Sequence, residues 1–160
     1  MSVRSHGFFR LFGFEGILCL VVLNAPHWFD RPTAPIQLAS WTLLAASLAL
    51  AIHGFHVLRT VGKPTAPAPG SDMHRIEHTT VLVSVGAYRY VRHPLYTSAV
   101  VGTCGVVLKA PSALAIGIGL LATAFWVATA KIEEAENLVR FGNSYRTYMA
   151  HTRLFIPFLF

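Results

Sequence analysis

The sequence is short of charged side chains. Asp, Glu, Lys and Arg together make up 12% of the 160 residues, and hydrophobic residues reach 54%. An ordinary soluble domain carries about 25% charged residues. So little charge cannot cover the surface of a water-soluble protein, and we therefore expect part of the surface to face lipid.

The sequence also has little cysteine. Its two cysteines, Cys19 and Cys104, both lie inside apolar stretches, which favours two small hydrophobic side chains over a disulfide or a metal-binding pair. The net charge of +6 would suggest nucleic acid in a soluble domain. Here the basic residues cluster at the ends of apolar runs, a pattern typical of membrane topology. We therefore expect a membrane bilayer as a partner and no nucleic acid.

The apolar runs predict an all-α, polytopic transmembrane helix bundle in one membrane domain. About 20 apolar residues are needed to cross the hydrocarbon core as a helix. The pattern predicts about four spans, the last two forming a short helical hairpin, followed by a C-terminal cytoplasmic helix and tail that complete a pocket; their ranges are 8–29, 36–58, 94–109, 112–130 and 131–160.

The basic residues predict the orientation of these spans. Two of the thirteen, Arg31 and Lys109, lie in the turns on one side. The other eleven lie before the first span, between the second and third, or after the fourth. Because Lys and Arg concentrate on the cytoplasmic side, we expect both termini and the long middle loop to be cytoplasmic.

Two polar motifs at this predicted cytoplasmic side could carry chemistry. The first runs from Gly86 to Tyr96 and places His93 directly before Pro94, which suits the first turn of a helix. The second, residues 131–148, begins with three carboxylates close to the end of the last span. The alternative is an interfacial belt of Tyr and Arg with a solvated helix start, although carboxylates at a membrane face often mark a site.

Together with Phe155-Ile156-Pro157, these motifs resemble the isoprenylcysteine carboxyl methyltransferases and the related phospholipid N-methyltransferases. The resemblance covers about residues 78–157. It implies an integral membrane methyltransferase with an S-adenosylmethionine pocket at the cytoplasmic face and no metal. The cofactor-binding residues that it implies are His93, Tyr96 and Glu133, with Pro94 and Leu95 between the first two, and less securely Tyr88 and the stretch Thr80, Val81, Leu82 and Val83.

Elementary chemistry agrees with this assignment. A carboxylate such as Glu133 can pair with the cofactor's ammonium, and Arg92 or His93 can pair with its carboxylate. Methyl transfer needs positioning rather than a covalent enzyme nucleophile. Arg92 and Glu134 are the candidate catalytic residues, and Glu134 could orient the acceptor or help to remove a proton.

The acceptor is expected to be a lipid or another lipophilic small molecule. The isoprenylcysteine enzymes place a substrate-binding arginine one turn before the acidic pair, where this sequence has Thr129. Thr129 cannot pair with a substrate carboxylate, which favours a lipid amine or an uncharged lipophile. His53 and His56, near the end of the second span, are packed or interfacial residues, or line the substrate opening.

Two other classes of function stay open at this stage. His74, Glu77 and His78 match a short zinc-peptidase pattern, in which two histidines four residues apart hold zinc and the glutamate acts as base. A third protein ligand would be needed. The remaining class is a non-catalytic membrane protein related to the methyltransferases.

Overall fold

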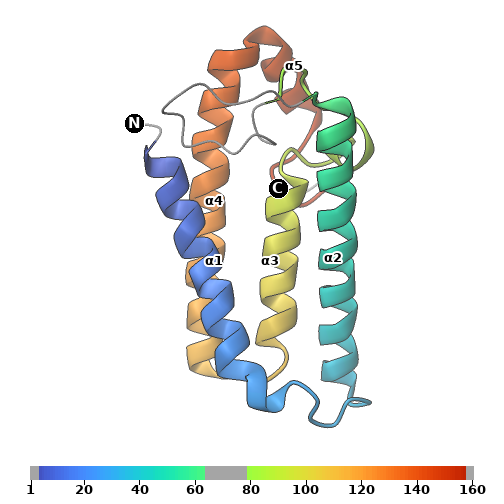
Figure 1. Ribbon diagram of the computed structural model, residues 1–160, viewed down its shortest axis with the longest axis vertical. Helices are drawn as coiled ribbons and strands as arrows, with labels where there is room; N and C mark the ends of the chain where they lie inside the picture. The colour runs from blue at the N-terminus through green and yellow to red at the C-terminus, as the bar shows by residue number, and fades with distance from the viewer. Residues whose placement is uncertain (1–3, 64–78, 158–160) are drawn as a thin grey trace.

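The computed structural model describes residues 4–63 and 79–157 of the chain. These residues form helices and no β-strand, which confirms the predicted all-α class. In chain order the elements are α1 (Arg4–Asn24), the 3-10 helix η1 (Ala25–His27), α2 (Pro35–Val61), the 3-10 helix η2 (Gly86–Arg89), α3 (Pro94–Val107), α4 (Ala113–Phe141) and α5 (Asn143–His151) (Figure 1).

The helices form a membrane bundle. Three segments, Gly7–His27, Pro35–Val61 and Ala113–Phe141, are long and apolar enough to cross a bilayer, and α3 is a shorter apolar helix. Large hydrophobic side chains such as Leu48 and Leu120 stay more than 60% exposed on these helices. A soluble protein could not leave so much apolar surface in water, so this surface faces lipid.

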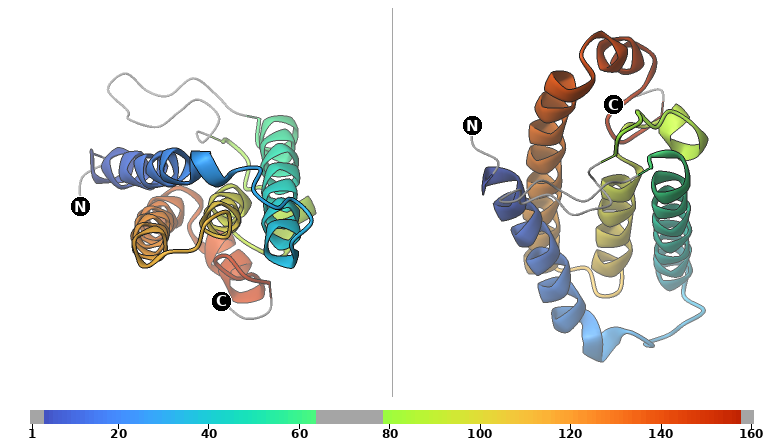
Figure 2. Two further views of the ribbon diagram at one scale, coloured as in Figure 1. Left: turned by 90° about the horizontal axis from the view of Figure 1, so that it is seen from below. Right: turned by 45° about the horizontal axis from the view of Figure 1, so that its top comes forward.

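The bundle consists of two tightly packed helix pairs. Helix α1 packs mainly against α4, and α2 mainly against α3, as the end-on and tilted views show (Figure 2). Small residues permit the close contacts: a Cβ added at Gly16 would lie 2.8 Å from that of Ala122, and one added at Gly102 would lie 2.8 Å from the hydroxyl of Ser47. Such contacts between small residues are what drives helix association in membranes.

Buried polar side chains surround the C-terminal end of α3. Asn24 of α1 donates to Val106 O (2.8 Å), and from α2 Ser40 donates to Gly105 O (2.7 Å) and Gln37 to Lys109 O (2.8 Å). The Lys109 ammonium lies 3.4 Å from the ring centroid of Trp41 and donates to Gln37 Oε1. The last carbonyls of a helix have no partner within the helix, so these contacts let a 14-residue helix end inside the bundle.

Helix α4 extends beyond the apolar run from which it was predicted. The change in polarity at Lys131 is not a helix end, because α4 continues without a break to Phe141 over 29 residues. At about 1.5 Å per residue such a helix exceeds 40 Å, whereas the hydrocarbon core is about 30 Å thick. One continuous helix therefore carries the carboxylates of residues 133–136 out of the bilayer. It ends at Gly142, whose φ of +55° favours glycine.

Candidate active site

A cavity opens where the polar third of α4 meets the ends of α2 and α3. It encloses about 620 Å³ of atom-free space, part of which is open to solvent. Five helical elements and the two loops on either side of η2 contribute to its wall, which consists of Leu58, Thr79, Leu82, Val83, Tyr88, Arg92, His93, Leu95, Tyr96, Glu133, Asn137, Phe141, Tyr145 and Tyr148.

His93 and Glu133 form the polar centre of this wall. His93 is the residue before Pro94, the first residue of α3, and its carbonyl accepts from Thr97 N (2.8 Å). Its side chain is 4% exposed, and Nδ1 lies 3.6 Å from Glu133 Oε2. The other ring nitrogen, Nε2, is buried and makes no hydrogen bond within the described residues. A buried polar atom left without a partner costs about 1–3 kcal/mol, so a ligand atom here would recover that cost.

An aromatic column supports the His93 ring from below. The rings of His93 and Tyr96 stack at 5.5 Å with 15° between their planes, and those of Tyr96 and Trp126 stack at 5.4 Å. Trp126 is 1% exposed, and its ring nitrogen is also buried without a hydrogen bond to any described residue. It does not line the cavity. This stacking fixes the position of the His93 imidazole at the cavity wall.

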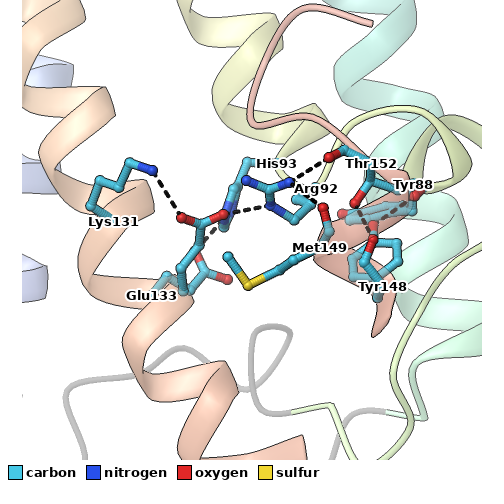
Figure 3. Close-up of polar contacts among 9 residues, drawn as sticks. Tyr88, Arg92, His93, Lys131, Glu133, Tyr148, Met149 and Thr152 are labelled. Atoms are coloured by element: carbon cyan, nitrogen blue, oxygen red, sulfur yellow. Dashed lines mark hydrogen bonds and ion pairs between the residues drawn. The ribbon is translucent and has the colours of Figure 1, made fainter. Parts of the chain in front are cut away.

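Arg92, the neighbour of His93, joins three segments of the chain (Figure 3). Its Nε donates to Glu134 Oε1 on α4, while Nη1 donates to Thr152 O at 2.6 Å and to Met149 O at 3.4 Å. Lys131 Nζ donates to the other oxygen of Glu134 (3.2 Å). Both carboxylate oxygens of Glu134 are therefore engaged, and the Arg92–Glu134 pair is 9% and 5% exposed.

The segment after α4 is fastened over the cavity by further contacts. Tyr148 of α5 donates its hydroxyl proton to Tyr88 O (2.6 Å). Val91 and Arg153 form a parallel bridge, in which Arg92 N donates to Arg153 O (2.8 Å). These contacts hold α5 as one wall of the cavity.

Two tyrosines of α5 stay protonated at neutral pH. Burial raises the pKa of Tyr145, and the negative charge of Glu134 raises it further. Burial likewise raises the pKa of Tyr148, with the neighbouring Tyr145 as a second cause. Both hydroxyls are therefore hydrogen-bond donors over the physiological range rather than proton acceptors.

Most of the residues expected in the site lie together. Leu82, Val83, Tyr88, Arg92, His93, Leu95, Tyr96 and Glu133 line the cavity. Thr80 and Val81 do not, because both are exposed and the Thr80 hydroxyl donates to Lys63 O. Pro94 is buried at the start of α3, and Glu134 lies behind the wall in its ion pairs.

Several wall residues were not expected as ligand contacts. Asn137 and Phe141 follow Glu133 at intervals of four residues, so one face of α4 supplies all three. That spacing was a usable signal, since Glu133 was already a candidate. Tyr145 and Tyr148 could not be placed from the sequence because the turn at Gly142 sets their direction.

Two other expectations have a definite location. His74, Glu77 and His78 lie outside the described residues. Within residues 4–63 and 79–157, no group of three His, Cys, Asp or Glu side chains could hold a metal ion. Thr129 is fully buried, and its hydroxyl donates to Phe125 O within α4, so its position faces the bundle interior rather than the cavity.

Comparison with known proteins gives one match. The family model described as phospholipid methyltransferase matches residues 36–143. This range begins in α2 and ends just after α4, and therefore includes His93, Tyr96 and Glu133. No curated protein and no solved structure matches the chain.

Proposed function

The chain belongs to the phospholipid methyltransferase family, and we propose that it is an integral membrane methyltransferase that transfers a methyl group from S-adenosylmethionine to a lipophilic acceptor at the cytoplasmic face. The observation that carries this proposal is His93, which lines the cavity with Nδ1 3.6 Å from the Glu133 carboxylate and has a buried Nε2 without a hydrogen-bond partner among the described residues.

The groups that line the cavity fit the cofactor. Glu133 can pair with an ammonium group through a charge-assisted hydrogen bond. His93 Nε2 and the amide of Asn137 can bond polar groups of the amino acid or ribose part. Tyr88, Phe141 and Tyr145 supply aromatic surface for an adenine ring. The cofactor-binding set that we propose is therefore His93, Tyr96 and Glu133 with Tyr88, Leu82, Val83 and Leu95, while Thr80, Val81 and Pro94 act through the backbone around them.

When bound, the cofactor supplies an electrophilic methyl group on a sulfonium. The side chains of this chain need only hold the acceptor in line, exclude water and accept a proton if the acceptor is an ammonium. Glu133 and His93 are the groups in the wall that can accept one, since both tyrosines are held protonated. Because Glu134 already has two cationic partners, we propose that Arg92 and Glu134 position His93 and α5 rather than touch the reacting atoms.

The acceptor is proposed to enter from the lipid. A groove on α2 is lined by Ala51, Ile52, Phe55, His56, Arg59, Thr60 and, from α3, Leu95. Leu95 also lines the cavity, so the two spaces share one side-chain wall. Apolar residues at one end and His56 and Arg59 at the other suit a lipid with a polar head. His53 is engaged elsewhere, since its Nε2 accepts from Ala87 N (3.2 Å).

A lipid amine or an uncharged lipophile is the preferred acceptor class. With Thr129 buried and bonded to Phe125 O, α4 offers no cation to a substrate carboxylate at that position. Burying an unpaired carboxylate there would be costly. The cytoplasmic placement rests on the basic residues, eleven of thirteen of which lie on one predicted side.

The test is a methyl-transfer assay on the purified full chain with radiolabelled S-adenosylmethionine and extracted membrane lipids. We expect label in a lipid product and saturable cofactor binding. A prenylated-cysteine analogue, compared in the same detergent, should turn over more slowly than the lipid amine. Cofactor binding without transfer to any lipid would instead identify a non-catalytic relative, and absence of binding by folded protein would refute the proposal.

A further inference from the structure

A second hollow lies at the same end of the bundle, outside the candidate cofactor cavity. It is lined by Arg89, Tyr90, Ala150, His151 and Arg153 and contains about 400 Å³ of atom-free space, part of which is open to solvent. None of these five residues lines the cofactor cavity or the groove on α2. We call it the arginine hollow.

The backbone fixes the two sides of the arginine hollow. Arg153 N donates to Tyr90 O (3.1 Å), and the parallel bridge between Val91 and Arg153 continues this pairing. The segment that carries Arg89 is thereby held against the segment that carries Arg153. Arg89 and Arg153, 64 residues apart in the sequence, line one hollow because of this pairing.

The arginine hollow has an excess of positive charge. Residues 79–130 and 137–157 contain no Asp or Glu at all, so neither segment that builds the hollow can neutralise its arginines. Among the described residues, α4 carries the carboxylates Glu133, Glu134 and Glu136, and none of them lines the hollow. Glu133 faces His93, and Glu134 pairs with Arg92 and Lys131. Guanidinium groups bind phosphate oxygens through paired N–H donors, which makes a phosphate the ligand that this hollow fits.

His151 adds a third nitrogen group to the wall. Its Nδ1 lies 2.9 Å from Thr147 O, and because a carbonyl only accepts, Nδ1 carries the proton of that bond. Nε2 is then the ring nitrogen that a ligand can contact, and it donates to a phosphate oxygen when the imidazole is protonated.

The position of the arginine hollow points to a lipid rather than a soluble anion. Tyr90 is 50% exposed on its rim, and after Arg153 the chain continues into Leu154 and Phe155, which are buried in the core cluster with Tyr96 and Trp126. The hollow thus lies where the apolar bundle meets its polar end, at the level where Tyr and Arg contact headgroups. We propose that the arginine hollow binds the phosphate of an anionic membrane lipid, at a site separate from the catalytic one.

Native mass spectrometry of the full chain in detergent can test this site, with phosphatidylglycerol and phosphatidylcholine of matched acyl chains as probes. Wild type should retain phosphatidylglycerol preferentially. Arg89→Gln with Arg153→Gln should lose that preference, by roughly fivefold for each arginine. Arg89→Lys with Arg153→Lys keeps the charge and should retain most of it.

The matched control is Arg31→Gln with Arg146→Gln, which removes the same charge from two exposed residues outside the hollow. It should retain the preference. As a second readout that needs no variant, phosphatidylglycerol should raise the unfolding midpoint of wild type more than phosphatidylcholine does. The proposal is wrong if wild type shows no preference, if the control pair loses as much as the hollow pair, or if inorganic phosphate displaces the bound lipid at equal concentration.

Discussion

The two ends of the bundle both bury polar side chains, but they use them differently. At the end that holds the α3–α4 turn, Asn24, Gln37, Ser40 and Lys109 are each bonded to a carbonyl or amide oxygen of the protein. At the opposite end, His93 buries a ring nitrogen that has no partner within the described residues. At the first end these buried side chains bond to the protein itself, whereas at the second end the His93 nitrogen is left able to bond a ligand.

This difference distinguishes buried polar groups that stabilise the helix bundle from those that are available to bind a ligand. Every backbone polar group in hydrocarbon must be satisfied by the protein itself. The bonds to the carbonyl groups at the C-terminal end of α3 meet this need, so they require no ligand. An incomplete set costs free energy and persists where a ligand completes it. Trp126 Nε1 also lacks a partner, but it lies under Tyr96 in the aromatic column rather than in the cavity wall. A buried nitrogen without a bond therefore marks a site only where its residue lines a cavity, as His93 does and Trp126 does not.

The largest effect is expected from the ion pair behind the cavity. Arg92→Met leaves the Glu134 carboxylate, 5% exposed, without its buried partner. Breaking a buried pair from one side costs about 3–5 kcal/mol. We expect that loss in the free energy of unfolding, measured by denaturing-detergent titration in mixed micelles. Arg92→Met with Glu134→Met should cost less than the single change, because no charge is then buried alone.

The exposed arm of the same network provides the control. The Lys131 side chain is 58% exposed, and surface ion pairs contribute about 0–1 kcal/mol. Lys131→Met should therefore change the unfolding free energy by less than about 1 kcal/mol. A loss as large as that of Arg92→Met would show that burial does not decide the strength of these contacts.

The next effect concerns the open end alone. Glu133→Gln removes the charge that we propose pairs with the cofactor ammonium, and a hydrogen bond to a charged group contributes about 1.5–3 kcal/mol. Isothermal titration should show that loss in S-adenosylmethionine affinity, with little change in stability. Glu136→Gln, three residues further along α4 and outside the cavity wall, makes the same change of charge and should bind normally. Equal affinity in wild type and Glu133→Gln would remove Glu133 from the site.

The closed end should give the opposite result. Asn24→Ala removes the bond from the buried Asn24 amide to Val106 O, which keeps its second donor, Lys109 N (3.1 Å). The loss of one net hydrogen bond costs about 0.5–1.5 kcal/mol of stability. Cofactor affinity of the folded protein should stay unchanged, since neither residue lines the cavity. A fall in affinity at constant stability would mean that the two ends are not independent.

The fold was largely readable from the sequence because its causes are local. The apolar runs predict the long helices. Helices α2 and α3 begin at Pro35 and Pro94, and proline is common in the first turn of a helix. The sequence divides this region at Lys131 into a span and a cytoplasmic helix, whereas the structure has one helix, α4, that continues to Phe141. Between Lys131 and Phe141 the sequence has no Gly or Pro, and this absence predicts that the helix continues to Gly142.

The site was only partly readable because half of its wall is set by tertiary contacts. His93, Tyr96 and Glu133 lie in dense polar motifs, and Asn137 and Phe141 follow from helical spacing. Tyr145 and Tyr148 reach the cavity through the turn at Gly142 and the bond of Tyr148 to Tyr88 O, 60 residues away. No local pattern in the sequence encodes that bond. The engagement of Glu134 by both Arg92 and Lys131 is likewise a property of the fold.

The smallest effect tests how α5 closes the open end. Tyr148→Phe removes the hydroxyl that donates to Tyr88 O at 2.6 Å, and a net hydrogen bond contributes about 0.5–1.5 kcal/mol. We expect the variant to unfold more easily by that amount at pH 7–9. Burial raises the pKa of Tyr148 above its usual value near 10. The stability that this hydroxyl provides is therefore fully present below about pH 10 and is lost as the pH rises through the folded-state pKa, because the unfolded chain ionises first. Unfolding titrations of wild type and Tyr148→Phe should accordingly converge above pH 10, while Tyr145, which is common to both proteins, cancels from the difference. A constant difference at all pH values would mean that the phenol of Tyr148 contributes through packing rather than through its bond to Tyr88.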